Sequence, residues 1–403
     1  MTTLKTAMAL ALAAGLAAGL AAPAKAASCG GARGFDRWLG ELKREAAAGG
    51  VSRRALSALN GITYDPGVVR RDRAQGVFAQ SFLKFAGRMV SNNRLVVGRK
   101  RLRQNARTFS RIKQRFGVPA PVITAFWGLE TDFGAFMGNF HTLRSLATLA
   151  RDCRRPELFR PQLIDALRLI DKGDLRASEM IGAWAGELGQ LQFLPSDYME
   201  SAVDFDGDGR RNLIRSSADA LASAANLMRR YGWRRGEPWL EEVRVPRSMP
   251  WDQADISIRH SRAQWAKWGV RKANGSSLKA DRYPASLILP MGRLGPAFLA
   301  YPNFQVYLKW NESLVYTTTA AYFATRLAGA PRVRRGNGNP EVLGVRQIKH
   351  LQRLLQRRGF DVGKVDGIIG AKSRAAIKAM QIKYRLPADS YPTTDLINRL
   401  QRG

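Results

Sequence analysis

One glutamate lies in a segment that could support acid–base chemistry: Glu130, within the apolar stretch Val122–Gly134. If the stretch is a helix, it has an apolar stripe facing a core, and Glu130 lies beside that stripe. Trp127 comes three residues before Glu130 and Phe133 three residues after it, so both rings can flank the carboxyl and contact a ligand. A carboxyl surrounded by aromatic rings loses water, which raises its pKa and keeps it protonated near neutral pH, ready to act as a general acid. The alternative is a surface glutamate on an ordinary amphipathic helix.

The elements that must position this segment are mostly helices. From Gly34 to about Tyr231, apolar residues recur three and four positions apart, which predicts amphipathic helices. The clearest of them are Gln75–Met89, Asn105–Phe116, Pro161–Ile170 and Ala218–Tyr231. The segment from about Pro238 to Asn303 is richer in Pro, Trp and β-branched residues and predicts short strands, and Trp310–Leu327 returns to a helical pattern.

The segment Phe126–Gly134 resembles the catalytic motif of the lytic murein transglycosylase B family (glycoside hydrolase family 103). The resemblance continues in the family's order over roughly residues 29 to 327. It is carried by Met137–Phe140, Ser145–Ala150, Asp152–Arg155, Trp184–Gly186, Gly189–Ser196, Asp204–Gly209, Gly232–Trp233, Tyr301–Phe304 and Trp310–Asn311. It implies a mainly α fold with a lysozyme-like helical catalytic core and a small irregular α/β insertion.

The resemblance also assigns roles to individual residues. It makes Glu130 the catalytic acid/base, Gln192 a saccharide contact in the groove, and Asn303 part of the far wall of that groove. Arg154 and Arg155 match a basic pair that could meet carboxylates of the substrate. Two alternatives stay open: the arginines could be a solvated helix end, and Gln192 a buried amide bonded to backbone.

One position departs from the family. Many relatives have a serine before the Trp/Phe-Ala-Gly element, and this chain has Ala183. The hydroxyl thought to help orient the substrate is therefore missing, which puts the detail of that subsite in doubt.

The implied reaction is the non-hydrolytic cutting of the N-acetylmuramic acid to N-acetylglucosamine bond in peptidoglycan, leaving a 1,6-anhydro end. One carboxyl can serve first as acid and then as base, whereas most glycosidases need two carboxyls. Asp132 is the obvious second carboxyl, but a helix directs it away from Glu130. Two other functions stay open: a muramidase that uses water, and a cell-wall-binding scaffold without activity.

An aspartate-rich loop could bind a metal ion. Asp204, Asp206 and Asp208 occupy positions 1, 3 and 5 of a calcium-loop pattern, with Asn212 at position 9. Arg215 stands where such a loop needs a glutamate, so Asp219 would have to complete the site. The alternative is a tight turn whose aspartates accept hydrogen bonds from backbone amides. We expect no required cofactor beyond this structural calcium.

The C-terminal part resembles a three-helix peptidoglycan-binding domain, over residues 343–403. The run Gly359–Gly370 carries the resemblance, and residues 331–342, rich in Gly, Asn and Pro, form the linker before it. We expect a catalytic domain over residues 27–330.

The N-terminus predicts export. A short basic start, an apolar run from Ala7 to Ala22 and Ala24-Lys-Ala26 form a signal peptide over residues 1–26, too short for a membrane span. Outside the cytoplasm, Cys29 and Cys153 are a plausible disulfide. Lipid anchoring on Cys29 is disfavoured because the residues before it make a poor lipobox.

The charge balance favours an anionic partner. Lys and Arg total 65 against 32 Asp and Glu, a formal net charge of +33. Nucleic acid, acidic lipid head groups and acidic cell-wall polymers all qualify, and export argues against nucleic acid. The family resemblance implies peptidoglycan glycan strands as the partner. We expect a periplasmic monomer with no transmembrane segment, which could be recruited to cell-wall synthesis or division complexes.

Overall fold

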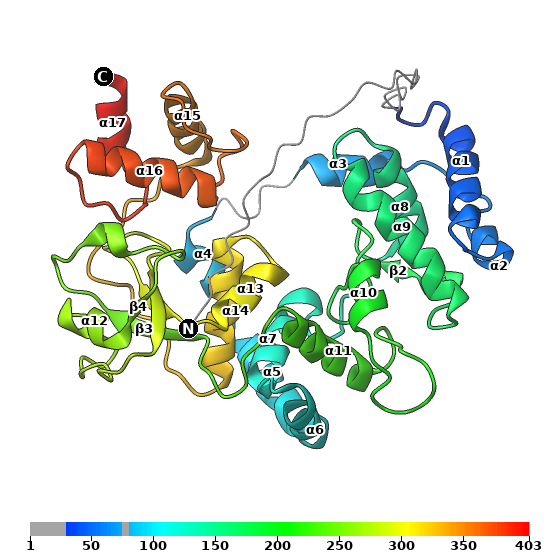
Figure 1. Ribbon diagram of the computed structural model, residues 1–403, viewed down its shortest axis with the longest axis horizontal. Helices are drawn as coiled ribbons and strands as arrows, with labels where there is room; N and C mark the ends of the chain where they lie inside the picture. The colour runs from blue at the N-terminus through cyan, green and yellow to red at the C-terminus, as the bar shows by residue number, and fades with distance from the viewer. Residues whose placement is uncertain (1–29, 75–79, 403) are drawn as a thin grey trace, which may run out of the picture.

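The computed structural model describes residues 30–74 and 80–402, and α-helices dominate it (Figure 1). The mainly α prediction is confirmed. The helices that precede the insertion are α1 (Phe35–Ala48), α2 (Arg53–Ser57), α3 (Pro66–Arg73), α4 (Phe82–Met89), α5 (Asn92–Gln104), α6 (Ala106–Phe116), α7 (Ala120–Thr131), α8 (Thr142–Arg151), α9 (Pro156–Asp171), α10 (Pro195–Ser201) and α11 (Ser217–Arg230).

Helix α7 is the central element of this helical part. All residues from Val122 to Leu129 are buried, so the helix is apolar on every side rather than on one stripe. It packs against α5, α6, α11 and the later helix α14 (Leu314–Leu327). Pro121 lies in its first turn, where a missing backbone N–H does no harm. A helix enclosed in this way holds Glu130, in its last turn, rigidly.

The predicted irregular insertion is an antiparallel sheet with its own apolar core. Five strands pair in the order β4-β6-β7-β3-β5, and helix α12 (Arg262–Lys267) packs beside them. The strands are β3 (Leu240–Arg244), β4 (His260–Ser261), β5 (Arg271–Lys272), β6 (Pro284–Ile288) and β7 (Ala297–Ala300). A further pair, β1 (Phe140–His141) with β2 (Ile181–Gly182), joins two loops of the helical part.

The helix predicted for Trp310–Leu327 is wrong in one respect, because it is two helices. α13 (Phe304–Trp310) ends at Trp310, and α14 begins at Leu314. Between them, the Asn311 side chain accepts a hydrogen bond from the Ser313 backbone N–H at 2.9 Å, and the Ser313 hydroxyl caps α14. Side chains that cap backbone groups compete with helix continuation, so the pair breaks the helix.

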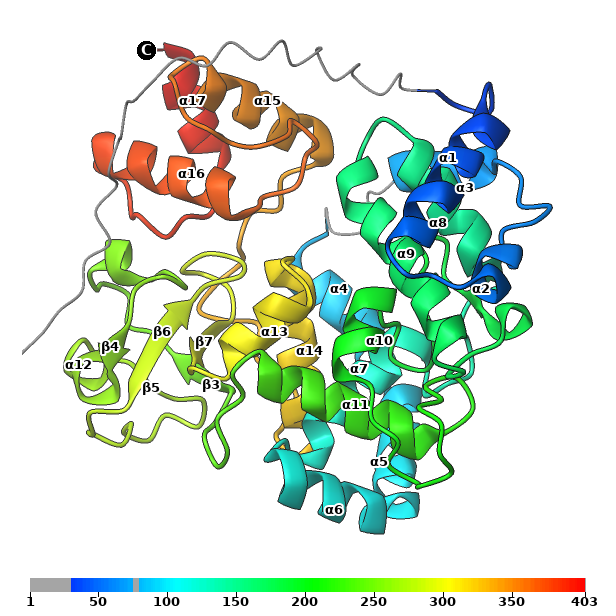
Figure 2. The same ribbon diagram turned by 45° about the vertical axis from the view of Figure 1, so that its right-hand side comes forward.

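The C-terminal residues form the predicted three-helix bundle: α15 (Val345–Gln356), α16 (Ala371–Lys383) and α17 (Thr394–Arg402). Its core is a separate apolar cluster that includes Leu351, Leu355 and Ile377. Figures 1 and 2 show the bundle seated over the sheet insertion. Lys378 on α16 makes an ion pair with Asp255 of the insertion at 3.1 Å, which fixes this placement.

The predicted signal peptide and Cys29 lie outside the described residues. Within the described ranges, every helix is too short or too polar to cross a bilayer.

Candidate active site

A groove of ≈270 Å³ runs past the C-terminal end of α7. Its walls come from α7, the segment 183–197, α11 and the break between α13 and α14. The lining residues are Glu130, Ala183, Trp184, Glu187, Gln192, Phe193, Leu194, Asp197, Leu227, Tyr231, Trp310 and Asn311. Three of these side chains are carboxyls and none is Lys or Arg, although the chain carries a formal net charge of +33. The groove is thus a local acidic site in a basic protein.

The end of α7 is shaped so that Glu130 reaches this groove. The backbone turns left-handed at Asp132 and Phe133, with φ of 48° and 63°, which ends the helix at Thr131. The Thr131 hydroxyl donates to the Gln190 carbonyl at 2.6 Å, and Arg94 makes an ion pair with Asp132. Non-glycine residues with positive φ are uncommon, and such strain is found at functional sites. Asp132 lies past the end of the helix and is not among the residues that line the groove.

Two donors distant in the sequence hold the Glu130 carboxyl. Trp310 Nε1 donates to Glu130 Oε1 at 3.0 Å, and the Tyr316 hydroxyl donates to the same oxygen. Trp310 is itself fixed by Phe126, with ring centroids 4.3 Å apart. Because Oε1 accepts both bonds, the proton of the neutral acid belongs on Oε2, which has no hydrogen-bond partner among the described residues. Glu130 therefore holds a transferable proton on its free oxygen.

Burial raises the pKa of Glu130 to about 7. Loss of water around the carboxyl is the main cause, and the nearby Glu187 carboxyl raises the pKa further. The hydrogen bonds from Tyr316 and Trp310 act in the opposite direction, since they stabilise the charged form. A carboxyl with this pKa is available both as acid and as base near neutral pH.

This balance predicts a pH profile. The first proton transfer needs neutral Glu130, so kcat/KM should fall about tenfold per pH unit above about 7. Tyr316→Phe removes a bond that lowers the pKa, so the descending limb should move to higher pH. Glu187→Gln removes a like charge, so the limb should move to lower pH. Steady-state assays on soluble glycan fragments across pH 5–9 measure both shifts. If kcat/KM of both variants fell at the same pH as that of the wild type, Glu130 would not be the group that titrates.

Two further carboxyls in the groove, Glu187 and Asp197, were not found by sequence reasoning. Burial raises the pKa of each. Glu187 Oε2 is buried with no partner among the described residues, while Tyr231 donates to Asp197 at 3.3 Å. The sequence offered no clear carboxyl partner for Glu130, and the structure places these two in the same groove. The only signal in the sequence was the proximity of Glu187 to Gln192.

Gln192 and Ala183 both line the groove. Gln192 Nε2 donates to the Gly189 and Met137 carbonyls at 2.9 and 3.2 Å, which leaves its amide oxygen without a partner in the described residues. Its backbone φ of 52° is left-handed, so a tight turn holds it in this position. Ala183 contributes only a methyl side chain to the groove lining.

Trp127, Phe133 and Asn303 do not line the groove, and their predicted substrate contacts are corrected. Trp127 and Phe133 are 2% and 5% exposed and pack edge to face against each other inside the protein. Asn303 is 0% exposed and bonds to the backbone of Arg234 and Glu237. Aromatic and amide side chains pack in protein cores as well as against ligands. Tertiary packing, not residue type, decides how far each one is buried.

Arg154 and Arg155 do not line the groove, although the positive charge of Arg155 acts to lower the pKa of Glu187, which does. Both make ion pairs with Asp72, whose side chain is only 1% exposed. A buried carboxylate needs such partners, since an unpaired buried charge is costly. The structure thus gives the arginines a structural role and does not place them beside Glu130.

The aspartate loop brings four carboxylates together. Ligand oxygens of Asp204, Asp206, Asp208 and Asp219 all lie within 4.8 Å of one another. The Asn212 side-chain oxygen accepts from the Ile214 and Arg215 backbone N–H groups, and Asp204 and Asp219 likewise accept from backbone N–H groups, as in the tight-turn alternative. The set fits the oxygen-rich coordination that calcium prefers.

The chain resembles several proteins of known structure or function. It is 41% identical to SltB3 from Pseudomonas aeruginosa, solved in complex with NAG-anhNAM-pentapeptide, covering 91% of this chain and 99% of that one with a TM-score of 0.85. The Escherichia coli lytic transglycosylase Slt35, solved in complex with calcium, is 26% identical over 72% of this chain and 92% of that one, with a TM-score of 0.62.

A curated relative gives the same result. The chain is 31% identical over 208 residues to the membrane-bound lytic murein transglycosylase B of Escherichia coli, which is 51% of this chain and 56% of that protein. Two family patterns match as well: the transglycosylase SLT domain over residues 34–325 and a peptidoglycan binding domain over residues 345–400. Since the first match covers well over half of the chain, the protein belongs to the transglycosylase SLT domain family, with a peptidoglycan binding domain after it.

Proposed function

We propose that this protein is a peptidoglycan lytic transglycosylase. The observation that carries the proposal is Glu130, a carboxyl with a pKa of about 7 whose free oxygen lies in a groove. A relative 41% identical over nearly its whole length was solved with an anhydro-muramyl ligand, which supports the same chemistry here.

The reaction follows from one carboxyl acting twice. Glu130 Oε2 gives its proton to the glycosidic oxygen as the bond to C1 of N-acetylmuramic acid breaks, and the 2-acetamido oxygen of that sugar stabilises the positive centre. The charged carboxylate, held by Trp310 and Tyr316, then takes the proton of the C6 hydroxyl. That oxygen closes on C1 and forms the 1,6-anhydro ring. The attack is intramolecular, so its effective concentration favours it over water.

The products of purified peptidoglycan test this function. After digestion, borohydride reduces ordinary muramic acid ends but leaves 1,6-anhydro ends unchanged, and mass spectrometry separates the two. We expect anhydro ends as the main product. A digest without anhydro ends, or no release of fragments, would refute the proposal.

A muramidase is the second candidate, and Glu187 and Asp197 are the observation that favours it. A hydrolase of this kind needs a second carboxyl to activate water or to attack C1. Both groups line the groove with Glu130. Burial raises the pKa of each, which reduces their charge and thus their strength as bases or nucleophiles at neutral pH. We therefore place the transglycosylase first.

The cellular setting is also a proposal. The basic and apolar N-terminus supports export to the periplasm, where Cys29 and Cys153 would pair. In that setting, the domain at residues 343–403, joined by the linker 331–342, would hold the enzyme on its polymer and raise the local substrate concentration. We propose glycan strands as the partner and a monomer that division or synthesis complexes can recruit.

We propose that the aspartate loop binds a structural calcium ion through Asp204, Asp206, Asp208 and Asp219. Its expected effect is on stability. Calcium bound only by the folded state adds about 2.7 kcal/mol to the free energy of unfolding at 100 times its Kd, and so raises the midpoint of thermal unfolding. Differential scanning fluorimetry in chelator and in millimolar calcium measures the shift. Asp208→Asn should reduce it, whereas Asp165→Asn, at a carboxylate outside the cluster that pairs with Arg168, should not. A wild-type midpoint independent of calcium would contradict the proposal.

A further inference from the structure

A pocket of ≈760 Å³ lies between α4, the beginning of α5, the end of α14 and the linker at residues 331–342. These helices pack against one another, with α14 beside both α4 and α5. Four arginines line the pocket: Arg326 at the end of α14, and Arg332, Arg334 and Arg335 in the linker. Its volume lies within the ~300–1,000 Å³ of pockets that take small organic ligands, so more than a single ion fits.

The segments that build this pocket hold no acidic residue. The sequence has no Asp or Glu in residues 73–129 or 313–340. In the described part of the chain, none of the four arginines makes an ion pair with a carboxylate. Arg326 Nη1 donates to the Tyr322 hydroxyl at 3.2 Å, and Arg326 Nε is buried without a hydrogen-bond partner among the described residues. Glu242, outside the pocket lining, accepts from the Arg334 backbone N–H at 2.9 Å, and its charge interacts with Arg334. One carboxylate beside four guanidinium groups leaves the pocket strongly positive.

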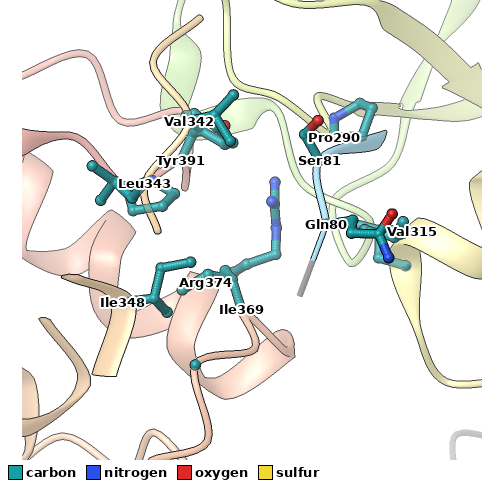
Figure 3. Close-up of a pocket in the computed structure, with 13 residues that line it drawn as sticks. Gln80, Ser81, Pro290, Val315, Val342, Leu343, Ile348, Ile369, Arg374 and Tyr391 are labelled. Carbon is teal, nitrogen blue, oxygen red and sulfur yellow. The ribbon is translucent and has the colours of Figure 1, made fainter. Parts of the chain in front are cut away.

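The cavity at the opposite end of α14 differs in this respect (Figure 3). It measures ≈80 Å³, and the arginine that lines it is Arg374. Burial lowers the pKa of Arg374, while Asp255, Asp389 and Tyr391 raise it because they favour the charged form. Groups of the chain itself therefore compensate the charge of Arg374. The four arginines of the larger pocket share one such group, Glu242, so most of their charge is left for a ligand.

The other walls of the larger pocket combine apolar and polar groups. The α4 wall is aliphatic, and a hydroxyl and an amide follow at the beginning of α5; these residues are Leu83, Ala86, Val90, Ser91 and Asn92. An added Cβ at Gly87, in the middle of the α4 wall, would meet no atom within 4 Å, so the space beside α4 is open. The positive end of the α5 helix dipole also lies at this wall, which adds to the field of the arginines.

A phosphate group matches this set of donors. It carries about −1.5 to −2 charges at neutral pH and three acceptor oxygens, so it can engage more than one guanidinium. Arginine binds phosphate in a bidentate geometry. A single phosphate leaves most of a ≈760 Å³ pocket empty, and the hydroxyl, amide and aliphatic groups beside it can contact a sugar ring.

We propose that this pocket binds a phosphorylated sugar, with the phosphate held by Arg326, Arg332, Arg334 and Arg335 and the sugar ring beside α4. The site is separate from the groove at Glu130, whose lining has three carboxyls and no Lys or Arg and so disfavours a phosphate. It gives the protein a contact with phosphate-bearing saccharides that the groove cannot make.

Calorimetry on the full chain tests the proposal with glucose 1-phosphate as the probe. An ionic strength of about 0.15 M screens the attraction to surface charges more than ~8 Å away. We expect saturable binding at one site per chain, and at least tenfold weaker binding of glucose and of inorganic phosphate. Arg326→Gln combined with Arg334→Gln should weaken binding at least tenfold. Arg103→Gln combined with Arg107→Gln removes the same charge from exposed positions of α5 and α6 and should leave binding unchanged.

Gly87→Leu tests the sugar half of the site without changing any charge. The leucine side chain would fill the open space beside α4, and leucine is a better helix former than glycine, so α4 should stay intact. We expect at least tenfold weaker binding of glucose 1-phosphate by this variant, with the weak binding of inorganic phosphate unchanged.

Two results would overturn the site: no saturable binding to the wild type, or equal losses in the two double variants. Binding of inorganic phosphate as tight as that of glucose 1-phosphate would overturn the assignment of a sugar. A measurement on the unaltered protein guards against a variant that fails to fold. In methyl NMR spectra of the wild type, glucose 1-phosphate should shift Leu83, Val90 and Val333, which line the pocket. Shifts confined to other methyl groups would also refute the proposal. None of these readouts depends on catalysis.

Discussion

Glu130→Gln should lower the rate of anhydro-end formation by ~1,000-fold or more and leave the fold intact. General acid–base catalysis contributes about 10²–10⁴-fold, and here one side chain performs both proton transfers. The substituted amide has the same shape, and its oxygen can still accept from Trp310 and Tyr316, so stability should change little. Rates on soluble glycan fragments and thermal unfolding of both proteins measure the two effects.

A matched control for this loss is Asp132→Asn, the carboxyl two residues away. Asp132 makes its ion pair with Arg94 outside the groove, so its replacement should affect stability more than rate. If the Glu130→Gln enzyme kept more than a tenth of wild-type activity, the general acid would be another carboxyl, with Glu187 as the first candidate.

Asn303→Ala should reduce the free energy of unfolding and leave KM almost unchanged. The Asn303 amide accepts from the Arg234 backbone N–H at 2.7 Å and donates to the Arg234 and Glu237 carbonyls at 2.9 and 2.8 Å. Alanine leaves these backbone groups without partners, and each such loss costs about 1–3 kcal/mol when the group is buried. We expect a total loss of about 3 kcal/mol in urea unfolding.

Gln192→Ala is the opposite case and serves as the comparison. Gln192 lines the groove, so its loss should raise KM, with a smaller effect on unfolding. If Asn303→Ala raises KM instead and unfolds like the wild type, then Asn303 contacts substrate in a conformation different from this one.

Local patterns in the sequence were enough to find Glu130 and to predict the helices around it. They were not enough to find Trp310 and Tyr316, which contact Glu130 from 180 and 186 residues away. The break between α13 and α14 that positions both residues was predicted as continuous helix. Capping by Asn311 and Ser313 ends the helix there despite the helical periodicity of the sequence. Departures of this kind from local sequence patterns are expected at functional sites.

Residue type alone also did not predict how far a side chain is buried. Trp127 and Asn303 are types that often contact sugars, yet both are enclosed by packing. The aspartate loop shows the reverse case. Asp219 lies eleven residues after Asp208, and its place in the cluster was predicted only as a replacement for a missing glutamate. Chain reversal between Asp208 and α11 brings it to the loop.

The central claim is that one carboxyl cuts the glycan without consuming water. Digestion of purified peptidoglycan in isotopically labelled water, followed by mass spectrometry of the muramic acid ends, tests it most directly. We expect 1,6-anhydro ends that carry no labelled oxygen, formed by the wild type and lost in Glu130→Gln. Labelled oxygen at C1 in the earliest products would contradict it, because water would then be the acceptor and Glu187 or Asp197 would be needed to activate it.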